Sequence, residues 1–213
     1  MDKNIKIEQL IQRFEQLDFL KPEINKVVDA IVNSYSSGGK LLVCGNGGSA
    51  ADADHIVGEL MKSFERKRPV NQKLKATLEN IDASRGEYLA DNLQQGFPAI
   101  SLNAHSGLIS AVANDIDADM VYAQQVTGYG NSGDILIGIS TSGNSQNVID
   151  ALIVAKAKGL ITIGLSGKTG GKMKAYCDFL INVPETRTAF VQELHLPVYH
   201  TICMMVEDAL FKK

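Results

Sequence analysis

Tryptophan is absent from this chain, and cysteine and proline are scarce, with three and five residues among 213. The cysteines, Cys44, Cys177 and Cys203, are odd in number and far apart, so their pattern indicates neither a disulfide framework nor a cysteine-based zinc motif. We therefore expect reduced thiols, mostly in the core of a cytoplasmic protein.

Long apolar runs and a strong excess of one charge are also missing. No stretch approaches the roughly 20 residues of a membrane-spanning helix, and Met1 to Asn4 lead into a mixed pattern without the apolar segment of a signal peptide. The 21 basic and 24 acidic side chains give a formal net charge of −3. We expect no membrane and no direct nucleic-acid binding, and interpret the basic run from Lys62 to Arg68, which Glu65 interrupts, as solvated surface.

The remaining composition is that of an ordinary globular protein. Hydrophobic residues make up 45% and charged residues 21% of the chain, which is long enough for one substantial core. We therefore predict a single domain over residues 1–213. Residues 5–36 follow helical spacing and predict two amphipathic helices, with Pro22 near the start of the second and Gly38-Gly39 after its end.

Short apolar strands then alternate with helices. The predicted strands are 40–44, 98–102, 134–139, 161–165 and 179–183, and helices are predicted near 106–113, 147–158 and 189–211. This alternation predicts an α/β three-layer sandwich of the doubly wound, flavodoxin-like kind, with a five-stranded parallel sheet and helices on both faces. The polar region 66–97 does not fit the alternation, and we interpret it as a helical insertion that forms a flap or an oligomer contact.

The loop after the third predicted strand is rich in hydroxyl groups. An apolar strand leads directly into Ser140, Thr141, Ser142, Gly143 and Ser145, and a helix follows. Unpaired N–H groups and the positive end of the dipole at a helix start favour an anion. The hydroxyls add neutral donors, and the glycine lets the main chain approach a ligand closely. We predict a sugar-phosphate site here, with an ordinary turn and a serine helix cap as the alternative.

A second polar loop, Gly45 to Ser49, follows the first predicted strand. Its glycines permit a tight turn and close approach of a polyhydroxyl ligand, and Ser49 with Asp52 has the spacing of a capping box. The loop is not a dinucleotide fingerprint, because Ala50 stands where the third glycine would be. Asn114-Asp115, after the second strand–helix unit, either reaches the same rim or forms a plain turn.

Two helices carry candidate metal ligands. His55 and Glu59 are one helical turn apart, and Gln192 and His200 are about two turns apart, although Pro197 between them should kink or restart the helix. Nitrogen and oxygen ligands of this kind suit Zn²⁺. A surface contact between the residues of the first pair and a solvated glutamine are the alternatives, and we interpret His195 as a supporting or interface residue.

Together these motifs resemble the sugar isomerase (SIS) domain family, most closely its sedoheptulose 7-phosphate isomerases. The resemblance rests on Cys44–Ser49 with Asp52, His55 and Glu59, on Asn114-Asp115, on Gly138–Ser145, on Gly167-Lys168 with Gly170–Met173, and on Gln192, Glu193, His195 and His200. It spans nearly the whole chain except the insertion, and the ordered set is more specific than any single motif.

The resemblance implies an assembly and a set of site residues. It implies a homotetramer with active sites at subunit interfaces and one zinc ion per subunit. The implied metal ligands are His55, Glu59, Gln192 and His200, and the implied acid/base pair is Glu59 and His200. The implied substrate-binding residues are Asn46, Gly47, Gly48, Ser49, Asn114, Asp115, Ser140, Thr141, Ser142, Ser145 and Gln192.

The implied reaction is an aldose–ketose isomerisation of a sugar phosphate, with sedoheptulose 7-phosphate giving D-glycero-D-manno-heptose 7-phosphate. A carboxylate can take the proton next to the carbonyl while an imidazole serves the oxygen. Two alternatives stay open. One is the same chemistry on another sugar phosphate, because no motif indicates the chain length of the sugar. The other is a non-catalytic SIS protein, either a sugar-phosphate sensor or a scaffold that associates with a replication initiator.

Overall fold

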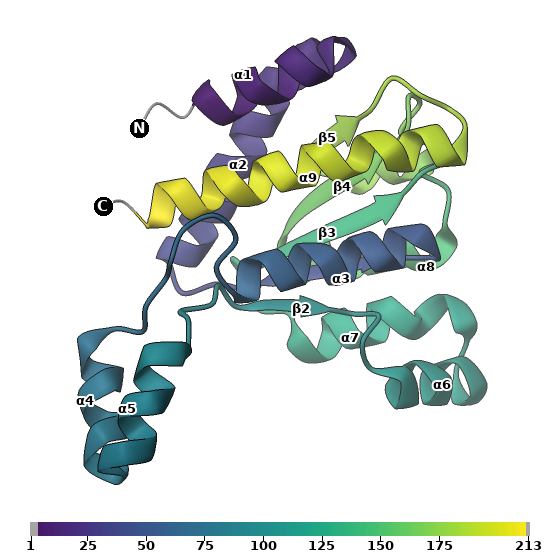
Figure 1. Ribbon diagram of the computed structural model, residues 1–213. Coiled ribbons are helices and arrows are strands. Elements are labelled where there is room, and N and C mark those ends of the chain that lie inside the picture. Colours follow the sequence, from purple (N-terminus) through teal and green to yellow (C-terminus); the bar gives the residue numbers. More distant parts are fainter. Residues whose placement is uncertain (1–3, 212–213) are drawn as a thin grey trace.

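A parallel sheet of five strands lies between two layers of helices in the computed structural model, which describes residues 4–211 (Figure 1). The strands are β1 (Leu41–Gly45), β2 (Ala99–Ser101), β3 (Ile135–Ser140), β4 (Ile161–Ser166) and β5 (Phe179–Asn182), in the order β2-β1-β3-β4-β5. All neighbours pair in parallel. The predicted fold class and all five predicted strands are confirmed.

Alternate residues of the central strands enter two separate cores. Leu41 and Val43 of β1 pack with one face, whereas Leu42 and Cys44 pack with the other. The first face is covered by α1 (Asn4–Arg13), α2 (Lys21–Ser36), α3 (Gly48–Met61) and α9 (Thr188–Leu210), with the 3₁₀ turn η1 (Glu15–Leu20) between α1 and α2. The second is covered by α6 (Ser106–Asp115), η2 (Ala118–Met120), α7 (Val121–Tyr129), α8 (Gln146–Ala157) and η3 (Lys172–Tyr176). Both faces of β1 and β3 are therefore buried, as their unbroken apolar runs predict.

The chain order places a crevice at the carboxyl ends of β1 and β3. From β1 the chain passes to β2 on one side and then crosses to β3 on the other. Ligands of open α/β sheets bind where the order reverses in this way. The two polar loops, after β1 and after β3, both lie at this point.

Two helix predictions are corrected by the structure. The α9 helix continues through Pro197 without restarting, and Thr201 Oγ1 donates a hydrogen bond to the carbonyl of Pro197 at 2.8 Å. Packing of Val198 and neighbouring side chains on the sheet outweighs the loss of one backbone hydrogen bond. Ser49 does not cap α3, because Gly47 holds that position with φ of 57° and Ser49 lies inside the first turn. The α7 helix has no counterpart among the predicted elements.

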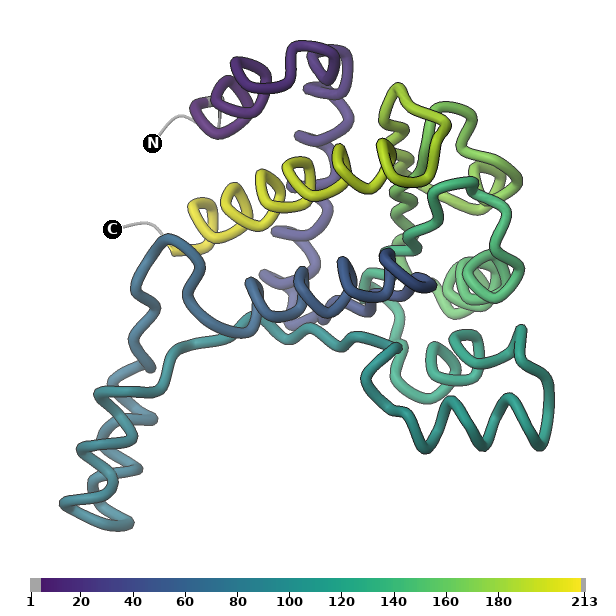
Figure 2. Tube along the Cα trace, turned by 45° about the vertical axis from the view of Figure 1, so that its right-hand side comes forward, coloured from purple at the N-terminus to yellow at the C-terminus, as the bar shows by residue number. Residues whose placement is uncertain are grey.

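The polar insertion is a helical hairpin that stands away from the rest of the chain (Figures 1 and 2). It consists of α4 (Gln72–Ile81) and α5 (Ala83–Asn92), which pack against each other. Asn71 caps α4 and Asp82 caps α5 through their side-chain oxygens. The residues of 66–97 that flank the two helices connect them to α3 and β2. Among residues 4–211, none of the helices has the length and apolarity needed to cross a membrane.

A buried ion pair joins the end of α3 to α9. Arg68 is 1% and Glu207 2% exposed, and Arg68 Nε lies 3.1 Å from Glu207 Oε1. The Glu207 carboxylate also accepts backbone N–H bonds from residues 64–66 at 2.9–3.0 Å. The Arg68 guanidinium donates to the carbonyls of Leu60 at 2.8 Å and Glu59 at 2.9 Å, which caps α3. The basic run around Arg68 was interpreted as solvated surface. The structure corrects this interpretation, because Arg68 is buried.

Removal of the Glu207 carboxylate should strongly destabilise the fold. Glu207→Ala leaves Arg68 buried without its counter-charge, and loss of one partner of a buried pair costs roughly 3–5 kcal/mol. Urea unfolding measures the difference. Asp91→Ala is the control, because it breaks an exposed ion pair with Lys75 on the hairpin and should leave the unfolding free energy close to that of the wild type. Equal effects of the two substitutions would contradict the assigned role of Glu207.

Candidate active site

The hydroxyl-rich loop gathers polar side chains at the end of β3. Ser140 is buried, and its hydroxyl lies 3.0 Å from that of Ser145. Ser145 occupies the N-cap position of α8 but makes no capping hydrogen bond, so the ordinary serine cap does not account for its hydroxyl. Thr141 is half-buried and Ser142 is exposed. The hydroxyls and the start of α8 together present neutral donors toward an anion.

The loop after β4 packs against the hydroxyl-rich loop. Gly143 has φ of 68°, and a Cβ there would lie 2.2 Å from the Gly170 carbonyl oxygen, so only glycine fits. The Met173 N–H donates to the Gly143 carbonyl at 2.9 Å, and the Lys172 N–H donates to Asn144 Oδ1 at 3.1 Å. Residues 167–173 therefore brace the hydroxyl-rich loop.

The loop after β1 is fastened to the start of α8. The amides of Asn46 and Asn147 exchange two hydrogen bonds, at 2.8 and 3.0 Å. The Tyr122 hydroxyl, from α7, lies 2.6 Å from the Gly45 carbonyl oxygen and 2.6 Å from Asn103 Oδ1. Sequence reasoning did not identify Tyr122, Asn103 or Asn147. Of the three, only Asn147 could have been predicted, because it lies in the first turn after the hydroxyl-rich loop.

Gln192 approaches this loop from α9. A Cβ on Gly48 would lie 2.3 Å from Gln192 Nε2, so the glycine makes room for the amide. Gly47 is exposed with open space around it, whereas Ser49 is 3% exposed. The structure thus joins Asn46, Gly48 and Gln192 at the crevice and places Ser49 beneath its surface.

His55, Glu59 and His200 form a second polar cluster between α3 and α9. His55 Nε2 lies 3.2 Å from Glu59 Oε1 and 3.4 Å from His200 Nε2. The Phe64 ring packs 5.4 Å from the His200 ring. Three of the four predicted metal ligands are therefore neighbours, while Gln192 contacts the loop after β1. Within residues 4–211, no group of three His, Cys, Asp or Glu side chains is placed so that it could hold a metal ion.

Burial shifts the pKa of two side chains at this contact, His200 and Asp52. Partial burial, with the nearby His55 as a second cause, lowers the pKa of His200 and favours its neutral imidazole. Burial raises the pKa of Asp52, and the hydrogen bond from Tyr199 opposes that rise. The Glu59 carboxylate also accepts a bond from Lys62 Nζ at 3.0 Å. A neutral imidazole beside a carboxylate can exchange protons with a substrate or bind a cation.

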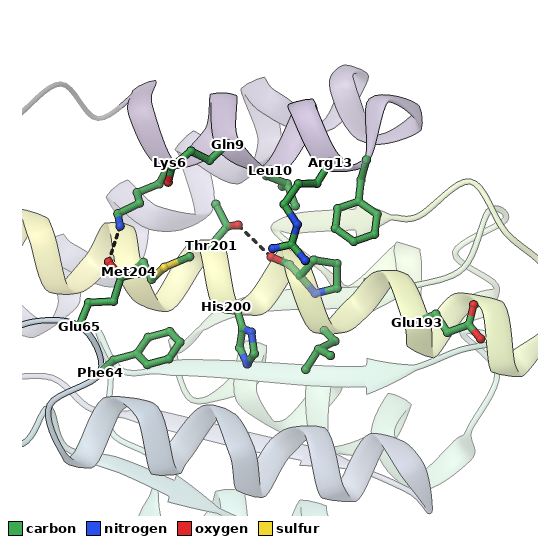
Figure 3. Close-up of a pocket in the computed structure, with 13 residues that line it drawn as sticks. Lys6, Gln9, Leu10, Arg13, Phe64, Glu65, Glu193, His200, Thr201 and Met204 are labelled. Atoms are coloured by element: carbon green, nitrogen blue, oxygen red, sulfur yellow. Dashed lines mark hydrogen bonds and ion pairs between the residues drawn. The ribbon is translucent and has the colours of Figure 1, made fainter.

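Of this cluster, His200 lines a cavity of about 390 Å³ between α1 and α9. Its walls carry Arg13 and Lys6 from α1, Glu193 and His200 from α9, and Phe64 from the loop after α3. Figure 3 shows His200 pointing from α9 toward α3, while Arg13 lies on the α1 side. The histidine is therefore accessible to a ligand from this side.

Other predicted residues lie apart from these groups. Asn114 and Asp115 are exposed at the end of α6, where the amide donates to the carboxylate at 2.8 Å, and neither contacts another predicted site residue. His195 is fully buried, so it is not an interface residue. That burial lowers the pKa of His195 to about 4, an effect that the Ser166 backbone opposes.

An open parallel sheet with a hydroxyl-rich loop at its switch point is the architecture of α/β proteins that bind ligands at the carboxyl ends of their strands. A family model described as the SIS domain matches residues 6–97 and 89–167. The chain belongs to the SIS domain family, and the expected resemblance is confirmed.

Relatives across the whole chain narrow the comparison to one group of enzymes. The chain is 37% identical over 212 residues to the phosphoheptose isomerase of Aneurinibacillus thermoaerophilus, a match that covers 100% of this chain and 92% of the relative. It is 42% identical over 188 residues to that of a Synechocystis strain, which covers 88% of this chain and 84% of the relative.

Solved structures agree with these sequence relatives. The phosphoheptose isomerase of Neisseria gonorrhoeae superposes with a TM-score of 0.74 at 31% identity, covering 95% of each chain. That of Francisella tularensis gives a TM-score of 0.76 at 30% identity, covering 95% of this chain and 94% of the other.

Proposed function

We propose that the protein is a sugar-phosphate isomerase that interconverts sedoheptulose 7-phosphate and D-glycero-D-manno-heptose 7-phosphate. The observation that carries the proposal is the contact between α3 and α9, where Glu59 Oε1 and His200 Nε2 both lie within 3.4 Å of His55 Nε2. The relatives named phosphoheptose isomerase support the choice of substrate.

The residues divide the reaction between two ends of the site. The hydroxyls of Ser140, Thr141, Ser142 and Ser145 hold the phosphate, and Asn46, Gly47 and Gly48 contact the sugar. Glu59 removes a proton from the carbon next to the carbonyl and returns it to the neighbouring carbon. His200, which its burial keeps neutral, transfers the proton of the substrate's hydroxyl oxygen. Both groups lie at the α3–α9 contact, so a sugar anchored by its phosphate can extend its other end toward them.

We further propose one zinc ion per subunit, bound by His55, Glu59, Gln192 and His200. Two imidazoles, a carboxylate and an amide are nitrogen and oxygen donors that Zn²⁺ accepts, and the first three donors are already neighbours. Zinc bound there supplies polarisation of the substrate carbonyl. Because Gln192 stands on the same helix as His200, it is the residue that completes the set.

The decisive experiment supplies zinc-loaded protein with sedoheptulose 7-phosphate and follows formation of the heptose phosphate, with elemental analysis alongside. We expect turnover and about one zinc per subunit, as a single four-ligand site requires. Turnover without zinc would remove the metal from the proposal. Neither zinc nor turnover, with tight binding of a protein partner instead, would favour the non-catalytic scaffold.

Glu59→Gln should abolish most turnover while phosphate binding persists. The amide cannot take a proton, and loss of a general base lowers kcat by roughly 10²–10⁴-fold. The hydroxyl-rich loop proposed to hold the phosphate follows β3 and is separate from the α3–α9 contact that includes Glu59. Competition by inorganic phosphate should therefore be unchanged. Glu79→Gln on the hairpin is the matched control and should retain wild-type kcat. Retained turnover in Glu59→Gln would exclude Glu59 as the base.

We also propose a homotetramer with active sites at subunit interfaces, located in the cytoplasm. The cavity beside His200 is also lined by Leu196 of α9, which is 41% exposed and leaves apolar surface beside the proposed catalytic groups. The three cysteines are free thiols, which suits a reducing compartment. Light scattering should give four times the chain mass of 23.0 kDa. Leu196→Glu should reduce both the mass and kcat, and a fully active monomer would contradict the interface sites.

A further inference from the structure

His55 is contacted on both of its ring nitrogens. Its Nε2 faces Glu59 and His200, as described above. Its Nδ1 lies 3.0 Å from the hydroxyl of Tyr199, which is 3% exposed. The same hydroxyl lies 3.3 Å from Asp52 Oδ1. Asp52, His55 and Glu59 recur at helical spacing along one face of α3, and Tyr199 and His200 are adjacent on α9.

Hydrogen-bond chemistry gives this chain of contacts a direction. An ionised carboxylate only accepts, so the Tyr199 hydroxyl donates its proton to Asp52. The hydroxyl oxygen then accepts a hydrogen bond from His55 Nδ1–H. Among the described residues, the other oxygen of Asp52, Oδ2, is buried without a hydrogen-bond partner. Tyr199 is therefore the side chain that orients both Asp52 and His55.

The hydroxyl of Tyr199 is not needed for packing. The phenol ring meets the rings of His55 and His200 edge-on, at centroid distances of 5.5 and 5.0 Å. A phenylalanine ring would preserve both contacts. Tyr35 offers the contrast, because its ring stacks on Phe97 at 5.1 Å while its buried hydroxyl has no partner among the described residues.

We propose that Tyr199, oriented by Asp52, is a positioning residue that holds the proton of His55 on Nδ1 and so leaves Nε2 free to bind zinc. The zinc half of this inference rests on the proposed function. The hydrogen bond to Nδ1 does not, because it is a property of the protein without metal. Residues that bond the second nitrogen of a metal-binding histidine typically raise metal affinity 10–100-fold.

Three variants separate the hydroxyl from the ring. Tyr199→Phe removes the acceptor of Nδ1–H, Asp52→Asn removes the charge but keeps an acceptor for the phenol, and Tyr35→Phe is the matched control. Zinc affinity, measured by competition with a chromophoric chelator, should fall roughly 10–100-fold in Tyr199→Phe, less in Asp52→Asn, and not at all in Tyr35→Phe. Thermal unfolding checks that each variant folds. Equal zinc affinity in folded Tyr199→Phe and wild type would overturn the inference.

A nitrogen-15 NMR spectrum of the histidine rings keeps the test independent of zinc. Metal-free wild type should show His55 Nδ1 protonated, with a slowly exchanging hydrogen, and Tyr199→Phe should lose that protection while Tyr35→Phe keeps it. An unprotonated Nδ1 in wild type would overturn the inference. A protein that binds no zinc yet shows the protected Nδ1–H would instead refute the metal of the proposed function and leave the role of Tyr199 standing.

Discussion

The candidate site depends on the fixed alignment of α3 and α9, and the ion pair of Arg68 with Glu207 holds that alignment. Glu207 orders the chain that leaves α3, and Arg68 returns to cap the last carbonyls of the same helix. The Arg68 guanidinium also lies 4.7 Å from the centre of the Phe97 ring, where the chain enters the sheet again before β2. When either partner of a buried charge pair moves away, the charge of the other is left uncompensated. The pair therefore favours one geometry.

The two ends of the candidate site rely on different kinds of interaction. At the carboxyl ends of β1 and β3, neutral hydroxyls and amides bond to one another in short-range networks, such as the paired amides of Asn46 and Asn147. Between α3 and α9, ionisable rings and carboxylates meet in a partly buried setting, where proton positions respond to each neighbour. The first end suits recognition of a group that does not react, and the second suits proton transfer.

Features that repeat or cluster over a few residues could be predicted from the sequence. The buried runs of β1 and β3, the hydroxyls after β3, and the one-turn spacing of His55 and Glu59 are all local signals, and the structure contains each of them. Tertiary partners could not be predicted in this way. Arg68 was interpreted as part of a charged surface, because no residue near it in the sequence indicates that Glu207 is its partner. Tyr199 carried no signal in the sequence, because its hydroxyl finds its partners only on α3.

Pro197 gives α9 a built-in point of weakness between its two functional segments. Proline has no N–H, so the carbonyl of Glu193 lacks its usual bond from four residues later, even though the helix continues. Any bending of this long helix concentrates where that bond is missing. Gln192 stands on one side of the joint and His200 on the other. A small bend at this point would change the separation between the Gln192 amide at the loop after β1 and the His200 imidazole beside α3.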